Sequence, residues 1–233
     1  MEFETEMTQH SLLNTRTQPP EFNLMNQIYK HQRFIYDASR KYYLLGRDNL
    51  IKGLKPPHNG TILELGCGTG RNLIQAANKY KDAEFYGIDI STEMLKTAQS
   101  TIRRRKLSRR IHISEGDATI IDPEATFNIR QFDRLFISFS LSMIPAWPQV
   151  IAHAQTLLRP GGELHIVDFG DCDGLSAMFR NSLYWWLARF HVHPIQGMST
   201  KLKYAAEQAG NSCRSRRLLR GYSVYTIIKK PLT

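Results

Sequence analysis

The chain has 233 residues, of which 42% are hydrophobic and 22% charged, and its formal net charge is +10. This length suits one generous domain or a domain with an appended segment, and the composition is that of an ordinary soluble globular protein. No apolar run approaches the roughly 20 residues of a membrane span, and acidic residues near the start argue against a signal peptide. Three widely separated cysteines without CxxC spacing predict reduced thiols in a cytosol.

Two segments precede the predicted core. Residues 1–20 are polar and end in Pro19-Pro20, which predicts a mobile arm. Residues 21–55 carry apolar side chains at helical spacing with a break near Gly46, and they predict two or three helices that form an N-terminal cap. The turn-forming run at 56–60 leads into the first predicted strand.

Strand and helix patterns alternate through the middle of the chain. Predicted strands at 61–65, 84–88, 111–115, 132–138 and 163–167 are interleaved with predicted helices near 71–80, 92–105 and 147–158. Such alternation predicts an α/β fold with a doubly wound, mostly parallel sheet. Helices near 175–190 and 200–208 follow, the first within a predicted helical insertion near 172–200. The runs 212–219 and 222–228 predict a strand pair that closes a seven-stranded sheet.

The most informative stretch is TILELGCGTG at 61–70. Its apolar run is typical of a buried strand, and three glycines in the next five residues allow a sharp bend and the close approach of a ligand. The N–H groups at the start of the following helix would face that ligand. Glu64 suits an ammonium group better than a pyrophosphate, and the G-x-G-x-G spacing is one residue shorter than the dinucleotide fingerprint.

Acidic residues also follow the next two predicted strands. Asp89 closes the second strand and can accept hydrogen bonds from two ribose hydroxyls, while Asp117 follows the third strand and can accept from an adenine amino group. Ala118 offers the neighbouring backbone N–H, and Ile90 and Met94 would cover the adenine face. One such carboxylate could be a solvated turn acid. Together with Glu64, however, Asp89 and Asp117 give three acids at three successive strand ends, which predicts a nucleoside site.

The segment ELGCGTG resembles the first motif of the class I S-adenosylmethionine-dependent methyltransferases. The resemblance implies a Rossmann-like fold over residues 56–233, with S-adenosylmethionine as the cofactor. It extends to the strand-four motif FDRLFISFSLSMI, in which Ser138 would face the methyl donor. The cofactor-binding residues that it implies are Glu64, Gly66, Cys67, Gly68, Asp89, Ile90, Met94, Asp117, Ala118 and Ser138.

The segments that flank these motifs are similar to the bacterial betaine-lipid methyltransferases. They are YKHQRFIYD at 29–37, SRKYYLLGRD at 39–48, LSMIP at 141–145 and LHIVDFGD at 164–171. This resemblance implies trimethylation of the homoserine amine of diacylglyceryl homoserine. It also implies an aminocarboxypropyl transferase that acts upstream, and a cytoplasmic protein attached peripherally to the inner membrane.

Residues of the cap are candidates for catalysis and for carboxylate binding. Tyr36 is expected to line the methyl-transfer chamber and to orient the acceptor amine, and Arg40 and Arg47 are expected to hold a carboxylate of the cofactor or the substrate. His165 is either a base or, inside a strand, a packed core residue. The histidines show no metal-ligand spacing, so we expect no metal.

Charge and amphipathicity leave several partners open. Phe179, Leu183, Trp186, Leu187 and Phe190 share one face of a predicted helix, which suits either a lid on the sheet or the water–lipid boundary. The basic runs 103–106, 109–110 and 214–220 suit solvated surfaces or anionic headgroups. Without an RNA-binding module or an N/D-P-P-Y/F motif, we expect no nucleic-acid partner. The alternatives are another small-molecule, phospholipid or quinone-precursor methyltransferase, an RNA methyltransferase, or a basic RNA-binding protein that no longer catalyses methyl transfer.

Overall fold

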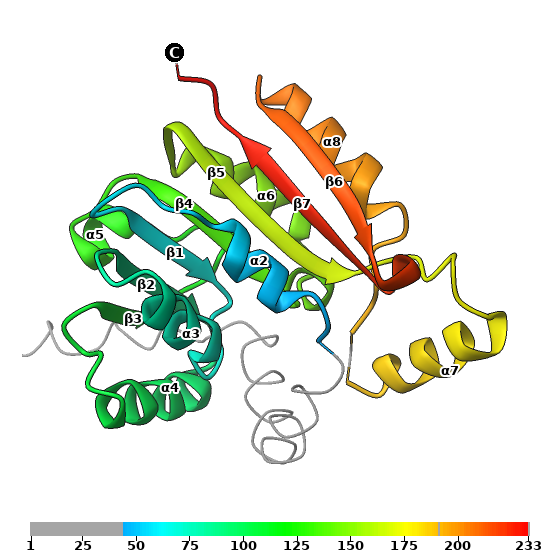
Figure 1. Ribbon diagram of the computed structural model, residues 1–233, viewed down its shortest axis with the longest axis horizontal. Helices are drawn as coiled ribbons and strands as arrows, with labels where there is room; N and C mark the ends of the chain where they lie inside the picture. The colour runs from blue at the N-terminus through cyan, green and yellow to red at the C-terminus, as the bar shows by residue number, and fades with distance from the viewer. Residues whose placement is uncertain (1–43, 191, 233) are drawn as a thin grey trace, which may run out of the picture.

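The computed structural model describes residues 44–190 and 192–232. In these ranges seven strands form one sheet in the order β3-β2-β1-β4-β5-β7-β6 (Figure 1). The strands are β1 (Thr61–Leu65), β2 (Glu84–Asp89), β3 (Ile111–Glu115), β4 (Phe132–Ser138), β5 (Leu158–Phe169), β6 (Ser212–Leu218) and β7 (Ser223–Lys229). The first five run parallel, and β7 pairs antiparallel with β5 and β6. The predicted seven-stranded, mostly parallel Rossmann-like sheet is confirmed, whereas most of the predicted cap lies outside the described residues.

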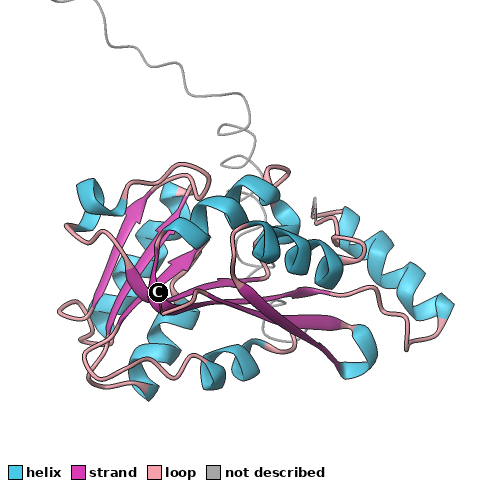
Figure 2. Cartoon of the chain, turned by 90° about the horizontal axis from the view of Figure 1, so that it is seen from above, coloured by secondary structure: helices cyan, strands magenta, loops and turns pink. Residues whose placement is uncertain are grey.

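Helices cover both faces of this sheet (Figure 2). One face packs against α2 (Arg47–Gly53), α3 (Arg71–Lys79) and α4 (Thr92–Arg104), and the other against α5 (Pro123–Phe127), α6 (Trp147–Thr156) and α8 (Met198–Gln208). Because successive strand side chains point to opposite faces, the fully buried Ile62 and Leu63 of β1 enter different clusters of the core.

Two elements differ from the sequence prediction. β5 begins at Leu158 and runs through Pro160-Gly161-Gly162, whereas the predicted strand began at residue 163. The extension arises because the residues after β7 continue the ladder: Gly161 N donates to Pro231 O at 2.9 Å, and Lys230 N donates to Gly162 O at 3.0 Å. The short α5 was not predicted. Its N-terminus is capped by Asp122, whose Oδ1 accepts from the backbone N–H of the second and third helical residues, and Pro123 stands at a position that favours helix starts.

Helix α7 (Ala177–Ala188) lies within the predicted insertion and extends to one side of the sheet (Figure 1). Leu187 is fully buried, and Leu183, Trp186 and Phe190 pack against the core cluster that includes the inner side chains of α2 and α3. Four of the five residues predicted to share one face therefore point inward, as in a lid on the sheet, while Phe179 remains exposed. Within the described ranges, no helix is long and apolar enough to cross a membrane.

Candidate active site

The glycine-rich turn after β1 is bent so tightly that its first glycine, Gly66, has no room for a side chain. The backbone N–H groups of Gly66 and Cys67 both donate to Ile88 O on β2 at 2.9 Å. Gly66 has a φ of +74°, and a Cβ atom at this position would lie 2.7 Å from Ser140 Oγ. A residue with a side chain would be strained here and would clash with Ser140, so the turn requires glycine at this position.

Asp89 ties this turn to the start of α4. Its Oδ2 accepts from Gly68 N at 2.7 Å, and its Oδ1 accepts from Ser91 N at 2.9 Å. Ser91 in turn caps α4 by accepting from Met94 N. The sequence predicted Asp89 as an acceptor for ribose hydroxyls; the structure adds that the same carboxylate holds the glycine-rich turn in place.

The other residues predicted to face the adenine lie beside Asp89. Gly116 N donates to Asp89 O at 3.1 Å, which brings the ends of β2 and β3 together. Met94 and Ala118 are buried, Ile90 is half-buried, and Asp117 is exposed. The Asp117 carboxylate accepts from the backbone N–H and the hydroxyl of Thr119, so it stabilises its own turn. Its contact with an adenine amino group stays a prediction.

A small pocket of about 30 Å³ lies at the carboxyl end of β1 and β4. Its lining brings together four of the predicted site residues, Arg47, Gly66, Cys67 and Ser138, with Leu44, Thr69, Arg71 and Asn72. The volume suits one end of a ligand rather than a whole cofactor. Sequence reasoning missed Arg71 and Asn72 because it treated them only as the start of a helix; polar residues directly after the glycine-rich turn were the available signal.

Glu64 and Cys67 are both buried next to the residues that line the pocket, and Cys67 is itself part of the lining. Glu64 Oε1 accepts from Asn72 Nδ2 at 2.7 Å. Burial raises the pKa of the Cys67 thiol well above its usual value, and the nearby charges of Asp89 and Glu64 raise it further. The thiol therefore stays protonated, and Cys67 fills space under the ligand instead of acting as a nucleophile.

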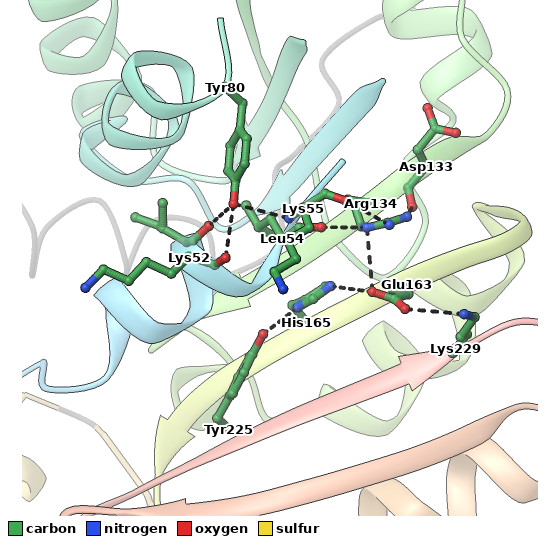
Figure 3. Close-up of polar contacts among 11 residues, drawn as sticks. Lys52, Leu54, Lys55, Tyr80, Asp133, Arg134, Glu163, His165, Tyr225 and Lys229 are labelled. Atoms are coloured by element: carbon green, nitrogen blue, oxygen red, sulfur yellow. Dashed lines mark hydrogen bonds and ion pairs between the residues drawn. The ribbon is translucent and has the colours of Figure 1, made fainter. Parts of the chain in front are cut away.

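A set of polar contacts holds the C-terminal end of α2 on the sheet (Figure 3). Arg134 donates from Nε to Leu54 O at 2.7 Å and from Nη2 to Lys55 O at 3.0 Å. Tyr80 donates from its hydroxyl to Ile51 O at 2.8 Å. These donors satisfy carbonyl groups that a helix end leaves without helical partners. With this end held, the other end of α2 places Arg47 in the pocket.

His165 lies below α2 in the same set of contacts and is fully buried (Figure 3). Its Nε2 is 3.2 Å from Glu163 Oε2, and its Nδ1 is 2.6 Å from the Tyr225 hydroxyl. Burial lowers the pKa of His165. A neutral imidazole must then donate from Nε2 to the carboxylate and accept the tyrosine proton at Nδ1. The prediction of a packed core histidine is confirmed.

The loop after β4 is fixed by a second buried acid, Asp168. Its Oδ1 accepts from Ser142 Oγ at 2.7 Å and from Phe169 N at 2.8 Å, and its Oδ2 accepts from Ser142 N at 3.1 Å. Burial raises the pKa of Asp168, and these hydrogen bonds oppose the rise. Asp168 thus positions the 3-10 turn at Leu141–Met143, which follows Ser138 in the chain.

Two predicted site residues, Tyr36 and Arg40, lie outside the described residues, and their roles stay predictions. Among the residues that the structure does describe, no cluster of three His, Cys, Asp or Glu side chains could hold a metal ion. The described site consists of the glycine-rich turn, the strand-end acids and the pocket with its two arginines.

These features have the Rossmann-like fold of the class I methyltransferases. Residues 62–162 match the family described as "Methyltransferase domain". The chain is 26% identical over 191 residues to 2-phytyl-1,4-naphtoquinone methyltransferase of Trichormus variabilis, with 78% of this chain and 80% of the relative covered. It is 27% identical over 164 residues to demethylmenaquinone methyltransferase of Lactobacillus johnsonii, with 68% of this chain and 64% of the relative covered.

A solved structure has the same fold at low sequence identity. Phosphoethanolamine N-methyltransferase 2 of Haemonchus contortus, in complex with S-adenosyl-L-methionine, superposes with a TM-score of 0.64 and 16% identity, and covers 79% of this chain and 52% of that one. The protein is a methyltransferase that uses S-adenosylmethionine. The two relatives are named for quinone substrates, which differ from the lipid amine that the flanking segments imply.

The residues present fit this cofactor. The turn at Gly66 admits no side chain, and the pocket is lined by two arginines and by two residues that carry buried unpaired polar atoms, which suits an amino-acid end. Gly66, Gly68 and Asp89 would hold the ribose side, and the residues after β3 the adenine. The cofactor supplies a methyl group on a sulfonium, which is reactive without a metal.

Proposed function

We propose that the protein trimethylates the homoserine amine of diacylglyceryl homoserine and so forms diacylglyceryl-N,N,N-trimethylhomoserine. The observation that carries this proposal is that two arginines, Arg47 and Arg71, line one small pocket. The amino-acid end of the cofactor has one carboxylate. A second arginine suits an acceptor that brings a carboxylate of its own, as homoserine does and a quinone ring does not.

The position of Arg71 supports an anion at this place. It is the first residue of α3, where the helix dipole disfavours a cation unless an anion lies nearby. Two arginines also disfavour a second positive charge beside them, so they would lower the pKa of the acceptor amine. Methyl transfer requires a neutral amine, so the protonated amine first releases a proton to solvent in each round; its lone pair then attacks the methyl carbon and the carbon–sulfur bond breaks.

The segments at 29–48, 141–145 and 164–171 supply the second line of support, because they are similar to betaine-lipid methyltransferases. Two of these segments meet in the fold. Asp168 on β5 fixes Ser142 through the hydroxyl and the backbone N–H. Tyr36 and Arg40, within the first segment, would complete the acceptor chamber from the cap.

A quinone precursor is the second candidate acceptor. The names of the relatives from Trichormus variabilis and Lactobacillus johnsonii favour it directly. Both candidates are amphiphiles that would reach the enzyme from a membrane. They differ in the acceptor atom, which is an amine nitrogen in one case and a ring carbon or oxygen in the other.

Lipid mass spectrometry separates the two candidates. Cells that express this chain together with an aminocarboxypropyl transferase that makes diacylglyceryl homoserine should accumulate lipids with one, two and three added methyl groups. The Asp89→Ala variant, in which cofactor binding should be weaker, serves as the low-activity control. A purified enzyme that methylates demethylmenaquinol but leaves diacylglyceryl homoserine unchanged would replace the first proposal with the second.

The two arginines provide a sharper test of the charge argument. Of the variants Arg47→Leu and Arg71→Leu, one should mainly raise the dissociation constant for S-adenosylmethionine and the other mainly the KM for the homoserine lipid. Titration calorimetry and steady-state kinetics measure the two quantities separately. If both variants changed only cofactor affinity, the second guanidinium would have no role in binding the acceptor.

We also propose that the protein works on the cytoplasmic face of the inner membrane, attached to anionic lipid through α7. The outer face of this helix exposes Met178 by 83%, Phe179 by 48% and Trp185 by 64%, and Arg189 stacks on the Trp185 ring at 5.0 Å. Leu219, 56% exposed, and Arg220 lie near the base of the helix, because Gly174 N donates to Arg220 O. Aromatic side chains with arginines suit a membrane interface.

Vesicle sedimentation tests this attachment. The protein should bind vesicles rich in anionic lipid and be released as salt rises, because salt screens surface charge. Trp185→Ala should reduce the binding that remains at high salt, whereas Arg104→Ala, an exposed arginine at the end of α4, should not. Equal binding to neutral vesicles by all three proteins would contradict the electrostatic part of the proposal.

A further inference from the structure

Two residues that line the pocket each carry a buried polar atom that has no hydrogen-bond partner among the described residues. The atoms are Asn72 Oδ1, at the start of α3, and Ser138 Oγ, at the end of β4. Asn72 is 9% exposed and Ser138 4%. Buried polar atoms are nearly always paired, so two unpaired atoms from different elements in one pocket indicate that a ligand pairs with them.

The orientation of the Asn72 amide follows from its one protein contact. Nδ2 lies 2.7 Å from Glu64 Oε1. An ionised carboxylate can only accept hydrogen bonds, so the amide must present its nitrogen to Glu64 and its oxygen elsewhere. Asn72 therefore offers an acceptor, and the buried Glu64 carboxyl group lies behind its amide.

An acceptor pair backed by a carboxylate suits a cationic donor. At the amino-acid end of S-adenosylmethionine, that donor is the α-ammonium group, which has three N–H bonds to donate. The carboxylate of the same end suits a guanidinium, and Arg47 and Arg71 line the same pocket. The two kinds of side chain thus match the two charged groups of an amino acid.

We infer that Asn72 Oδ1 and Ser138 Oγ accept hydrogen bonds from the α-ammonium of the cofactor, and that Asn72 is a cofactor-binding residue specific for the amino-acid end. Glu64 acts through Asn72 by fixing the orientation of its amide. This inference concerns the cofactor alone. It holds whether the methyl acceptor is a lipid amine or a quinone precursor.

Titration calorimetry without any acceptor tests the inference. The ligands are S-adenosylhomocysteine and 5′-methylthioadenosine, which lacks the amino-acid end. Asn72→Leu and Ser138→Ala should each weaken S-adenosylhomocysteine binding by roughly 10- to 100-fold, as expected for a hydrogen bond to a charged group. Their affinity for 5′-methylthioadenosine should equal that of the wild type. Asp89→Ala, on the ribose side, should weaken both ligands alike.

A third ligand separates the ammonium from the carboxylate. Decarboxylated S-adenosylmethionine keeps the amine, so both variants should still bind it more weakly than the wild type does. Unchanged binding of this ligand would assign the two atoms to the carboxylate and overturn the inference. Unchanged S-adenosylhomocysteine binding with a raised KM for the acceptor would assign them to the acceptor amine, which also overturns it.

Ser138→Ala keeps the test valid if Asn72→Leu folds poorly. Asn72→Leu also removes a donor from the buried Glu64, so its melting temperature can fall for a structural reason. Ser138→Ala removes a hydroxyl that has no hydrogen-bond partner in the described residues. Its melting temperature should therefore not fall, and a loss of S-adenosylhomocysteine affinity in this variant reports the ligand contact directly.

Discussion

Replacing Glu163 by Gln should destabilise the fold by an amount that depends on pH. The Glu163 carboxylate lies 3.2 Å from His165 Nε2, 3.6 Å from Arg134 Nε and 3.7 Å from Lys229 Nζ (Figure 3). The hydrogen bond from His165 lowers the pKa of Glu163 most. Burial opposes this shift and the charges of Arg134 and Lys229 assist it, so the pKa falls from the ordinary 4.5 of a glutamate to about 2.

The sign of the pH dependence follows from that difference. A carboxyl group whose pKa is lower in the folded state stabilises the fold fully above the unfolded value, and the contribution disappears as the pH falls toward the folded value. The difference between 4.5 and about 2 corresponds to about 3 kcal/mol at pH 7. At pH 3 only about 1 kcal/mol remains, because the unfolded state is then already protonated.

Urea unfolding at pH 7 and pH 3 measures both values. Glu163→Gln should be less stable than the wild type by up to about 3 kcal/mol at pH 7, and the gap should narrow to about 1 kcal/mol at pH 3. The control is Glu124→Gln, an exposed acid 3.8 Å from Arg130, which should change stability by less than about 0.5 kcal/mol. An unchanged urea midpoint at pH 7, or a difference in stability of equal size at both pH values, would refute the conclusion that the charge of Glu163 stabilises the fold.

Three further predictions concern the site. Asp89→Ala should weaken S-adenosylmethionine binding by roughly 10- to 100-fold in calorimetry and lower the melting temperature, because Gly68 N and Ser91 N lose their acceptor; retention of both properties would contradict it. Gly66→Ala should lower the free energy of unfolding in urea by more than Gly197→Ala does, since both have positive φ but only Gly66 has Ser140 within contact. Tyr36→Phe should lower turnover at every methylation step with little change in cofactor affinity, and an undiminished rate would make Tyr36 a packing residue.

Local patterns are enough to predict most of the sheet and its edge. Alternating strand and helix patterns predict the order of the parallel strands, and the glycine-rich turn predicts its own bend because few other residues tolerate it. Glu64 and Asp89 can be placed at one edge from the sequence alone, since the carboxyl ends of parallel strands meet there. Each of these features depends on a few consecutive residues.

The remaining features depend on residues that are distant in the chain. Asn72 and Ser138 line one pocket only because β1 pairs with β4. The spacing of residues within a single segment does not predict which strands become neighbours in the sheet. Arg134 and Glu163 lie on adjacent strands, and their joint hold on α2 arises from packing across the sheet. For α7, the sequence predicted an apolar face that could pack on the sheet or lie at a membrane surface. In the structure most of this face packs inward, because Leu187 is part of the hydrophobic core. Burial and strand pairing decide such contacts because both are properties of the assembled layers rather than of any single segment.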